Sequence, residues 1–216
     1  YSNKIFETNA KIKILDKKDS ALELPSAADL FSSSKINLEN EIEVITSYPI
    51  LEQVVRNQKL TTSVIAIGDI MESLTESYPF TITSKHPIDS IRQMLFRIDL
   101  TEKGLEVKEY KNKNKEYIFK NFSTYGVKHN LPFEISNLDK KHWNKLENEG
   151  YYLSFKSINQ AVSNLKKEIK VSSIGKDSDI LNINFNTTNS ISARKTLNEL
   201  IAVFNTDGIK DRQLIH

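Results

Sequence analysis

The spacing of apolar residues predicts strands at the start of the chain and through its middle. Residues 4–15 (KIFETNAKIKIL) alternate apolar and polar side chains, with Ile12 and Ile14 on one face, which is typical of a strand. Between residues 92 and 156 the same period of two recurs in short runs joined by polar turns. We therefore expect a small antiparallel sheet or sandwich in this part, interrupted by a helix at 139–148. The alternating apolar residues are Met94, Phe96, Ile98, Leu100, Leu105, Val107, Tyr117, Phe119, Phe133, Ile135, Tyr151, Leu153 and Phe155.

A helical period covers residues 37–58, with a proline near the middle. Asn37 is a suitable N-cap, and the following glutamates place negative charge in the first turn, where the helix dipole favours it. Pro49 lacks a backbone donor and clashes with the preceding turn. The pattern predicts two helices or one kinked helix, with Ser47 or Tyr48 capping the second part and Pro49 in its first turn. The apolar stripes are Leu38, Ile42 and Ile45, then Ile50, Leu51, Val54 and Val55.

The remaining segments alternate between helix and strand, which together with the stretches above indicates an α+β chain. Residues 16–36 are polar and rich in serine, as in a loop or excursion. We expect strands at 61–67 and 79–84 with a short helix at 70–77 between them, a helix at 157–168, a hairpin turning at 175–178, and a helix from 187 to 204. That last helix is capped by Thr188 or Asn189, and its apolar face consists of Ala193, Leu197, Leu200, Ile201 and Phe204.

Composition narrows the possible functions without selecting one. The 216 residues are long enough for a proper core, and the net charge of +2 gives no electrostatic reason to expect nucleic acid as a partner. The absence of cysteine excludes disulfides and thiolate chemistry. No run of about 18 apolar residues is present, so no segment is expected to span a membrane. The opening YSNKIF favours a strand over a signal peptide, and both ends look cut from a longer protein.

Residues that commonly carry catalysis form no recognisable site. The four histidines, at 86, 129, 142 and 216, lack metal-ligand spacing, and no phosphate-binding or nucleophile motif occurs. We therefore expect no catalytic residue, no metal and no cofactor. A chain of this kind is expected to bind, assemble or space rather than to catalyse, and a hydrolase with a dispersed active site is the least favoured alternative.

Three surface features have two interpretations each. Glu39 and Glu43 lie at i, i+4, so they form either a solvated face or an interface that attracts cations. Lysines and aromatics alternate at 108–120, as in a hairpin tip or, less favoured, a nucleic-acid stripe. Trp143 and the tyrosines at 151 and 152 are core residues or a platform for stacking sugars. The sequons at Asn121 and Asn186 are weak evidence for glycosylation.

The order of segments resembles one known family. KIFETNAKIKILDK is followed by the serine-rich excursion ending in DLFSSSK, then INLENEIEVITSYPILEQVV, TTSVIAI and GDIMESLTESYPFTI. This series is similar to the extracytoplasmic part of the polysaccharide co-polymerases, the chain-length determinant (Wzz-type) family. The nearest resemblance is to Wzc-like members, whose periplasmic region precedes a cytoplasmic tyrosine autokinase.

The resemblance is most specific in the first 80 and last 45 residues or so. A family segment like NEIEILKSRPLLEKVV corresponds to this chain from Asn40 to Val55, including Pro49. The stretch DILNINFNTTNSISARKTLNELIAVF of this chain resembles the closing strand and helix of the family, where an alanine is followed five residues later by an asparagine. Here these residues are Ala193 and Asn198. The ESYPF stretch and STYGVKHNLPFEI match family elements more loosely.

The resemblance implies a fold, a location and partners. It implies a Wzz-like α/β base domain, a mixed sheet packed by helices, formed by residues 1–84 and 157–216, with a small antiparallel β module inserted at 85–156. It implies the periplasmic face of a bacterial inner membrane, with membrane spans outside this chain. It also implies a non-catalytic domain that oligomerises, partners a polysaccharide polymerase and an outer-membrane export protein, and regulates the length and export of capsular polysaccharide or exopolysaccharide, which it could itself contact.

A closed ring requires one face of a subunit to meet a different face of its neighbour. The acidic helix residues Glu39, Glu41 and Glu43 could meet the basic residues Arg56, Arg194 or Lys195 of the next subunit. The alternative to an assembly domain is an extracytoplasmic carbohydrate-binding or adhesin-like β module.

Overall fold

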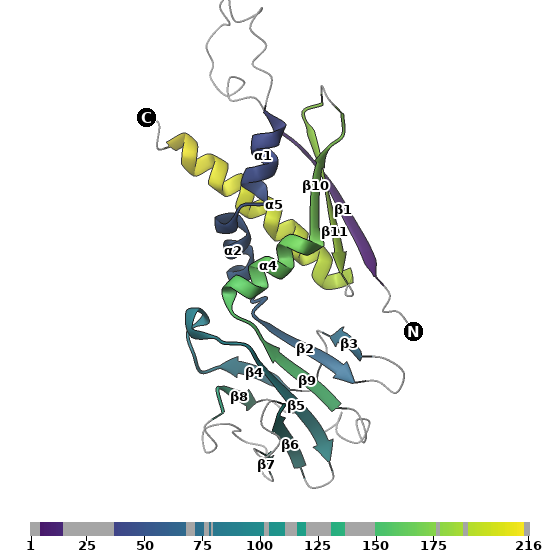
Figure 1. The fold of residues 1–216 in the computed structure, drawn as a ribbon, viewed down its shortest axis with the longest axis vertical. Helices are drawn as coiled ribbons and strands as arrows, with labels where there is room; N and C mark the ends of the chain where they lie inside the picture. The colour runs from purple at the N-terminus through teal and green to yellow at the C-terminus, as the bar shows by residue number, and fades with distance from the viewer. Residues whose placement is uncertain are drawn as a thin grey trace, which may run out of the picture.

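The chain crosses between two groups of elements, which we call the α-lobe and the β-lobe (Figure 1). The computed structural model describes residues 5–14, 37–67, 72–75, 78, 80–101, 104–110, 116–119, 131–136, 150–175, 178–187 and 190–213. The α-lobe is the upper part of Figure 1 and contains four helices on a three-stranded sheet. The β-lobe below it contains a six-stranded and a two-stranded sheet. This organisation confirms the α+β class.

The sheet of the α-lobe joins the two ends of the sequence. Its strand order is β1 (Phe6–Lys13), β11 (Ile180–Thr187) and β10 (Ile169–Ser173). β1 pairs with β11 along its whole length, from Phe6 opposite Thr187 to Lys13 opposite Ile180. Both pairings are antiparallel, so the expectation of a mixed sheet is wrong for the described strands. β10 and β11 form a hairpin, which is antiparallel by construction, and no βαβ crossover supplies a parallel neighbour.

Of the two alternatives predicted around Pro49, two helices or one kinked helix, the structure has two helices, α1 (Leu38–Ile45) and α2 (Tyr48–Asn57). The side chain of Asn37 accepts hydrogen bonds from the backbone N–H groups of residues 39 and 40, which confirms it as the N-cap. Ser47 is the N-cap residue of α2, and Pro49 lies in its first turn, where its missing N–H costs nothing. The proline therefore separates an acidic helix from an aliphatic one.

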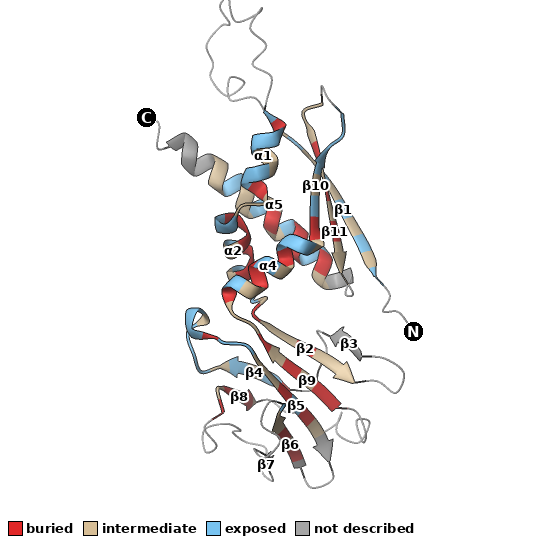
Figure 2. Cartoon of the chain, viewed as in Figure 1, coloured by how far each residue is buried: buried red, intermediate tan, exposed pale blue. Residues whose placement is uncertain are grey.

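The four helices bury one continuous apolar cluster against the sheet of the α-lobe (Figure 2). α4 (Ile158–Glu168) and α5 (Ser190–Gln213) complete this lobe, and α2 packs against both of them. The cluster contains Ile45, Ile50, Leu51, Val54, Val55, Ile158, Ala161, Val162, Leu165, Ile169, Ile183, Phe185, Ala193, Leu197 and Leu200. Residues from both ends of the sequence thus share one core.

The β-lobe is a small antiparallel sandwich, as the alternation predicted. Its six-stranded sheet has the order β3 (Glu72–Thr75), β2 (Thr62–Ile67), β9 (Gly150–Phe155), β5 (Met94–Thr101), β6 (Gly104–Glu109) and β7 (Glu116–Phe119). The pair β4 (Thr81–Ser84) and β8 (Phe133–Ser136) packs on it, and the 3-10 helix η2 (Ile88–Ser90) precedes β5. Phe133 of β8 lies 4.9 Å from Phe96 of β5 and 5.5 Å from Phe155 of β9, measured between ring centroids.

Two expectations about this region are wrong. The short helix expected at 70–77 is replaced over Glu72–Thr75 by strand β3, which pairs antiparallel with β2. A helix of the eight residues expected is unstable by itself, whereas the open edge of β2 supplies a row of hydrogen bonds. The first domain boundary moves from 84/85 to residue 61, because Val64 and Phe80 belong to the core of the β-lobe. On either side of the second expected boundary, at 156/157, Phe155 belongs to the core of the β-lobe and Ile158 to that of the α-lobe.

Some expectations lie outside the described residues. These are the helix at 139–148 with Trp143, the alternative caps Thr188 and Asn189, the sequon at Asn121 and the serine-rich excursion. The other sequon residue, Asn186, is half-buried in β11.

Candidate ligand-binding cleft between the lobes

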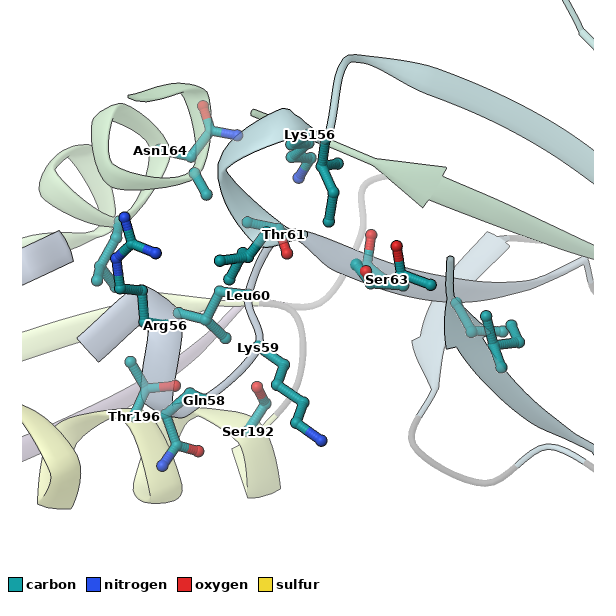
Figure 3. Close-up of a pocket in the computed structure, with 18 of the residues that line it drawn as sticks. Arg56, Gln58, Lys59, Leu60, Thr61, Ser63, Lys156, Asn164, Ser192 and Thr196 are labelled. Atoms are coloured by element: carbon teal, nitrogen blue, oxygen red, sulfur yellow. The ribbon is translucent and has the colours of Figure 1, made fainter. Parts of the chain in front are cut away.

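A cleft of about 920 Å³ opens where the chain passes from one lobe to the other (Figure 3). Its walls come from the end of α2, the start of β2, strand β4, helix α4 and the first turns of α5. The chain makes this crossing twice, through residues 58–61 and through Lys156 with Ser157. The two connections are joined by a hydrogen bond of 2.8 Å from the backbone N–H of Lys156 to the carbonyl of Thr61. These two connections, joined by that hydrogen bond, form the floor of the cleft, and we call them together the hinge.

Lys59 has an uncommon backbone conformation on this hinge. Its φ is +54°, and it is the single non-glycine residue with positive φ among the described residues. It follows the C-cap of α2: its N–H donates to the carbonyl of Arg56, and the N–H of Leu60 donates to that of Val55. This is the Schellman arrangement, in which glycine is the usual residue because a side chain costs about 1 kcal/mol there. The chain keeps a lysine at this position, and its side chain lines the cleft.

Buried polar side chains concentrate in the cleft. In the part of the chain that the structure describes, Thr61 and Thr196 are the two polar residues classed as buried, each 2% exposed, and both line the cleft. A buried hydroxyl group requires a hydrogen-bond partner. Two buried threonines in one cleft therefore make it a place where polar contacts are needed. Further hydroxyl and amide groups on the walls are Ser63, Thr62, Thr81, Thr83, Ser84, Ser192, Gln58 and Asn164.

The charged groups of the cleft are mainly basic. Arg56, Lys59, Lys156 and Lys195 line it, and among the described lining residues Glu168 is the one carboxylate and His86 a further titratable group. The positive end of the dipole of α5 points to the same region, because residues 192, 195 and 196 lie in its first two turns. The lining as a whole favours an anionic ligand that also carries hydrogen-bonding groups.

Arg56 links the two lobes and is already paired. Its guanidinium binds Asp89 of η2 and, at 2.6 Å, Glu52 of its own helix. The hydrogen bond to Asp89 and then that to Glu52 raise the pKa of Arg56 above its ordinary value, and Arg56 lowers the pKa of Asp89. Because Asp89 belongs to the β-lobe, this surface ion pair connects α2 to the opposite wall of the cleft.

Glu168 ends α4 on the wall of the cleft and is half-buried. Burial raises the pKa of its carboxyl, and the nearby ammonium of Lys156 lowers it by a smaller amount. The ionised form of Glu168 therefore lowers the free energy of unfolding.

Replacing Glu168 with glutamine is expected to raise the melting temperature at neutral pH. Since the pKa in the folded state exceeds the value of 4.5 in the unfolded state, the folded chain binds more protons in this range. The destabilisation caused by ionised Glu168 is therefore absent below pH 4.5, and it grows as the pH rises toward and through the pKa of Glu168 in the folded state. The gain of Glu168→Gln should disappear in acid, as measured by thermal unfolding over a pH series.

The exposed Glu7 of β1 provides the matched control, since Glu7→Gln removes a carboxylate from open solvent. This variant should change the melting temperature at neutral pH by little, because the side chain is exposed. Equal gains from Glu168→Gln in acid and at neutral pH would contradict the desolvation of Glu168.

The predicted interface residues do not form one site. Glu39 and Glu43 are exposed and Glu41 is half-buried on α1, which lies toward the end of the α-lobe far from the β-lobe (Figure 1). Arg194 and Lys195 are exposed on α5. Arg56 and Lys195 line the cleft, whereas the three glutamates do not.

The aromatic alternatives are resolved where they are described. Tyr151 is 4% exposed in the core of the β-lobe, with its ring edge-on to Phe80 at 5.4 Å, so the core interpretation holds and this ring is not part of a sugar platform. Tyr152 is half-buried on the other face, edge-on to the exposed Tyr110. The segment Glu116–Phe119 is strand β7 paired with β6, which favours the hairpin interpretation of the lysine-rich stretch.

Comparisons with known proteins identify no family for this chain: no family model matches it, and no curated protein matches it. Within the described ranges, no group of three histidine, cysteine or carboxylate side chains is arranged to hold a metal ion. None of the described helices has both the length and the apolar content needed to cross a bilayer.

The sequence analysis missed the cleft. Its residues come from positions near 60, 82, 160 and 195, and no motif links them. One local signal was available: α2 is followed by a lysine where a helix C-terminus usually carries glycine.

Proposed function

We propose that this chain is the non-catalytic extracytoplasmic domain of a polysaccharide co-polymerase, which assembles with copies of itself and regulates the length and export of a bacterial polysaccharide. One observation carries the proposal: most of the sequence that resembles the family, at the two ends of the chain, folds into a single lobe. β1 pairs with β11, and Val54 and Val55 of α2 share a core with Leu197 and Leu200 of α5.

The inserted position of the β-lobe supports the same function. The α-lobe is interrupted after α2 and resumes at α4, and the sequence between them forms a separate sandwich. The resemblance implies this arrangement of a base domain with an inserted β module, although the insertion begins at residue 61 instead of 85.

The surface charges of the α-lobe suit a contact between unlike faces of neighbouring subunits. Glu39 and Glu43 are exposed on one face of α1, and Arg194 is exposed on α5. Arg56 is a weaker candidate because Glu52 and Asp89 of its own chain already bind its guanidinium. In a ring, the acidic face of each subunit would meet Arg194 of the next.

Deleting the gene for the protein that carries this chain is expected to change the length distribution of the cell's capsular polysaccharide or exopolysaccharide, measured by gel electrophoresis or size-exclusion chromatography. The wild-type gene should restore it. Unchanged polymer length and amount after deletion would overturn the proposed function.

Reversing the charge of Glu39 and Glu43 to lysine in the full-length protein is expected to reduce the cross-linked oligomer severalfold, because like charges across an interface repel. Adding Arg194→Glu should restore the oligomer, since the charge pair is then re-formed with opposite signs. Glu7→Lys, on exposed β1, is the matched control and should have no effect. An unchanged oligomer in the double variant would overturn the interface while leaving the proposed function standing.

A further inference from the structure

We propose that the cleft between the lobes binds a segment of an acidic sugar chain, one whose sugars carry carboxylate groups. The choice of a polysaccharide as the source of the ligand rests on the proposed function. The chemistry of the ligand, sparse negative charge together with many hydroxyl groups, comes from the lining of the cleft. Of the lining residues, Arg56 and Lys195 were selected from the sequence, and those as candidates for a contact between subunits.

The size and openness of the cleft suit a short stretch of an extended chain. Its volume of about 920 Å³ lies near the upper end of the roughly 300–1,000 Å³ typical of small-molecule sites. Its lining extends from β4 across the hinge to α5. In Figure 3 Thr61 and Leu60 lie between the side chains of Lys59 and Lys156, so a ligand that meets both lysines must run along the hinge.

Two lysines supply positive charge from the two connections. Neither the ammonium of Lys59 nor that of Lys156 lies within 4 Å of a carboxylate of another described residue, and Lys156 interacts with Glu168 at longer range. Lys59 keeps a side chain at a backbone conformation that glycine would adopt without strain. Local strain that a chain retains is commonly found at functional sites. In this proposal the positive charge of Lys59 binds the anionic ligand, which compensates for the free energy that its backbone conformation costs.

Hydroxyl and amide groups provide the contacts that a sugar needs. Thr61 and Thr196 are buried beneath the cleft, and Ser63, Thr83 and Asn164 stand on its walls. Sugars present hydroxyl groups that both donate and accept, so they can satisfy buried threonine hydroxyls in the way water would. Tyr78 is also on the wall, with its ring packed 5.2 Å from that of Phe80 between centroids.

The balance of charge distinguishes this ligand from a dense polyanion. Glu168 places a carboxylate on the wall, and Arg56 is neutralised by Glu52 and Asp89. A nucleic acid carries a charge at every nucleotide and requires a strongly basic surface. A sugar chain with an occasional carboxylate needs two or three cations and many neutral donors, which is the composition of this lining.

Titration calorimetry on the 216-residue chain tests the proposal with a matched pair of ligands. The probe is a hexamer in which glucuronate alternates with N-acetylglucosamine, so that every second sugar carries a carboxylate, and its control is the same hexamer with every carboxylate methyl-esterified, which keeps the length and the hydroxyls. The acid is expected to bind at least about tenfold more tightly than the ester, since charge-assisted hydrogen bonds are lost with the carboxylates. Inorganic phosphate should compete only weakly.

Lys59→Gly is the most informative variant because glycine suits the positive φ at this position. It should keep or raise the melting temperature while weakening binding of the acid about tenfold, so a misfolded chain cannot explain the loss. Lys156→Ala should weaken binding similarly. Lys166→Ala, on the exposed side of α4 outside the cleft, is the matched control and should bind like the wild type.

Four results would overturn the proposal: no binding of the acid by the wild type at millimolar concentration, equal affinity for the acid and its ester, full competition by phosphate, or equal losses in Lys59→Gly and Lys166→Ala. Failure here is distinguishable from failure of the proposed function. If gene deletion changes polymer length and the titration is negative, only the cleft proposal falls. If the titration is positive and deletion leaves the polymer unchanged, the cleft binds an acidic glycan in another role.

Discussion

Replacing Phe155 with alanine is expected to destabilise the β-lobe by about 3–5 kcal/mol, the usual cost of deleting a buried phenylalanine ring. Phe155 is 1% exposed and packs against Phe96 and Phe133, at centroid distances of 6.2 and 5.5 Å. Its ring joins the six-stranded sheet to the β4–β8 pair. Removing it leaves a cavity that strands held by backbone hydrogen bonds cannot easily close.

Hydrogen exchange measured by mass spectrometry checks where this effect lies. Peptides from β5, β8 and β9 should lose protection in Phe155→Ala, whereas peptides from α2 and α5 should keep it, because the two lobes have separate apolar clusters. Ser154→Ala, one residue away on the opposite face of β9, is the matched control and should be nearly neutral. Uniform loss of protection in both lobes would contradict their independence.

Leu51→Ala should have the complementary effect, destabilising the α-lobe by about 2–5 kcal/mol. Leu51 is fully buried on α2, in the cluster that α2 shares with α4 and α5. Gln53→Ala, on the exposed side of the same helix, is the control and should cost little. Chemical denaturation should show a lower midpoint for Leu51→Ala, and hydrogen exchange should place the loss in α2, α4 and α5.

If β5 and β9 lose as much protection as α2 in Leu51→Ala, the lobes unfold as one unit. The two variants together therefore measure how strongly the hinge and the Arg56–Asp89 pair couple the lobes. Ile88 of η2 packs against the apolar clusters of both lobes and can also transmit the effect. Few further contacts are expected to do so, because the described helices and strands pack extensively only within their own lobe.

Features that depend on neighbouring residues were predictable from the sequence. Asn37 as a cap, the division at Pro49 and the alternation in β5 and β9 follow from local hydrogen bonding, ring geometry and the period of a strand. The apolar faces of α2 and α5 likewise follow from helical spacing.

Features that depend on a distant partner were not predictable in the same way. The stretch Glu72–Thr75 forms a strand because the edge of β2 is available, and the boundary at residue 61 depends on which core Val64 joins. The cleft is harder still, since it brings Lys59, Lys156 and Thr196 together from separate connections and helices. No periodicity in the sequence indicates that these three residues lie close together, because their proximity depends on the tertiary structure alone.

The pairing of β1 with β11 sets an order for folding during synthesis. All the described strands of the β-lobe lie between Thr62 and Phe155, so that lobe can complete its sheets while later residues are still on the ribosome. The α-lobe cannot, because Ala10 must wait for Ile183, and Leu51 for Leu197 and Leu200. Until those residues emerge, the aliphatic face of α2 stays open to solvent and to chaperones. We therefore expect the nascent chain to fold the β-lobe first and the α-lobe, which needs residues from both ends of the sequence, last.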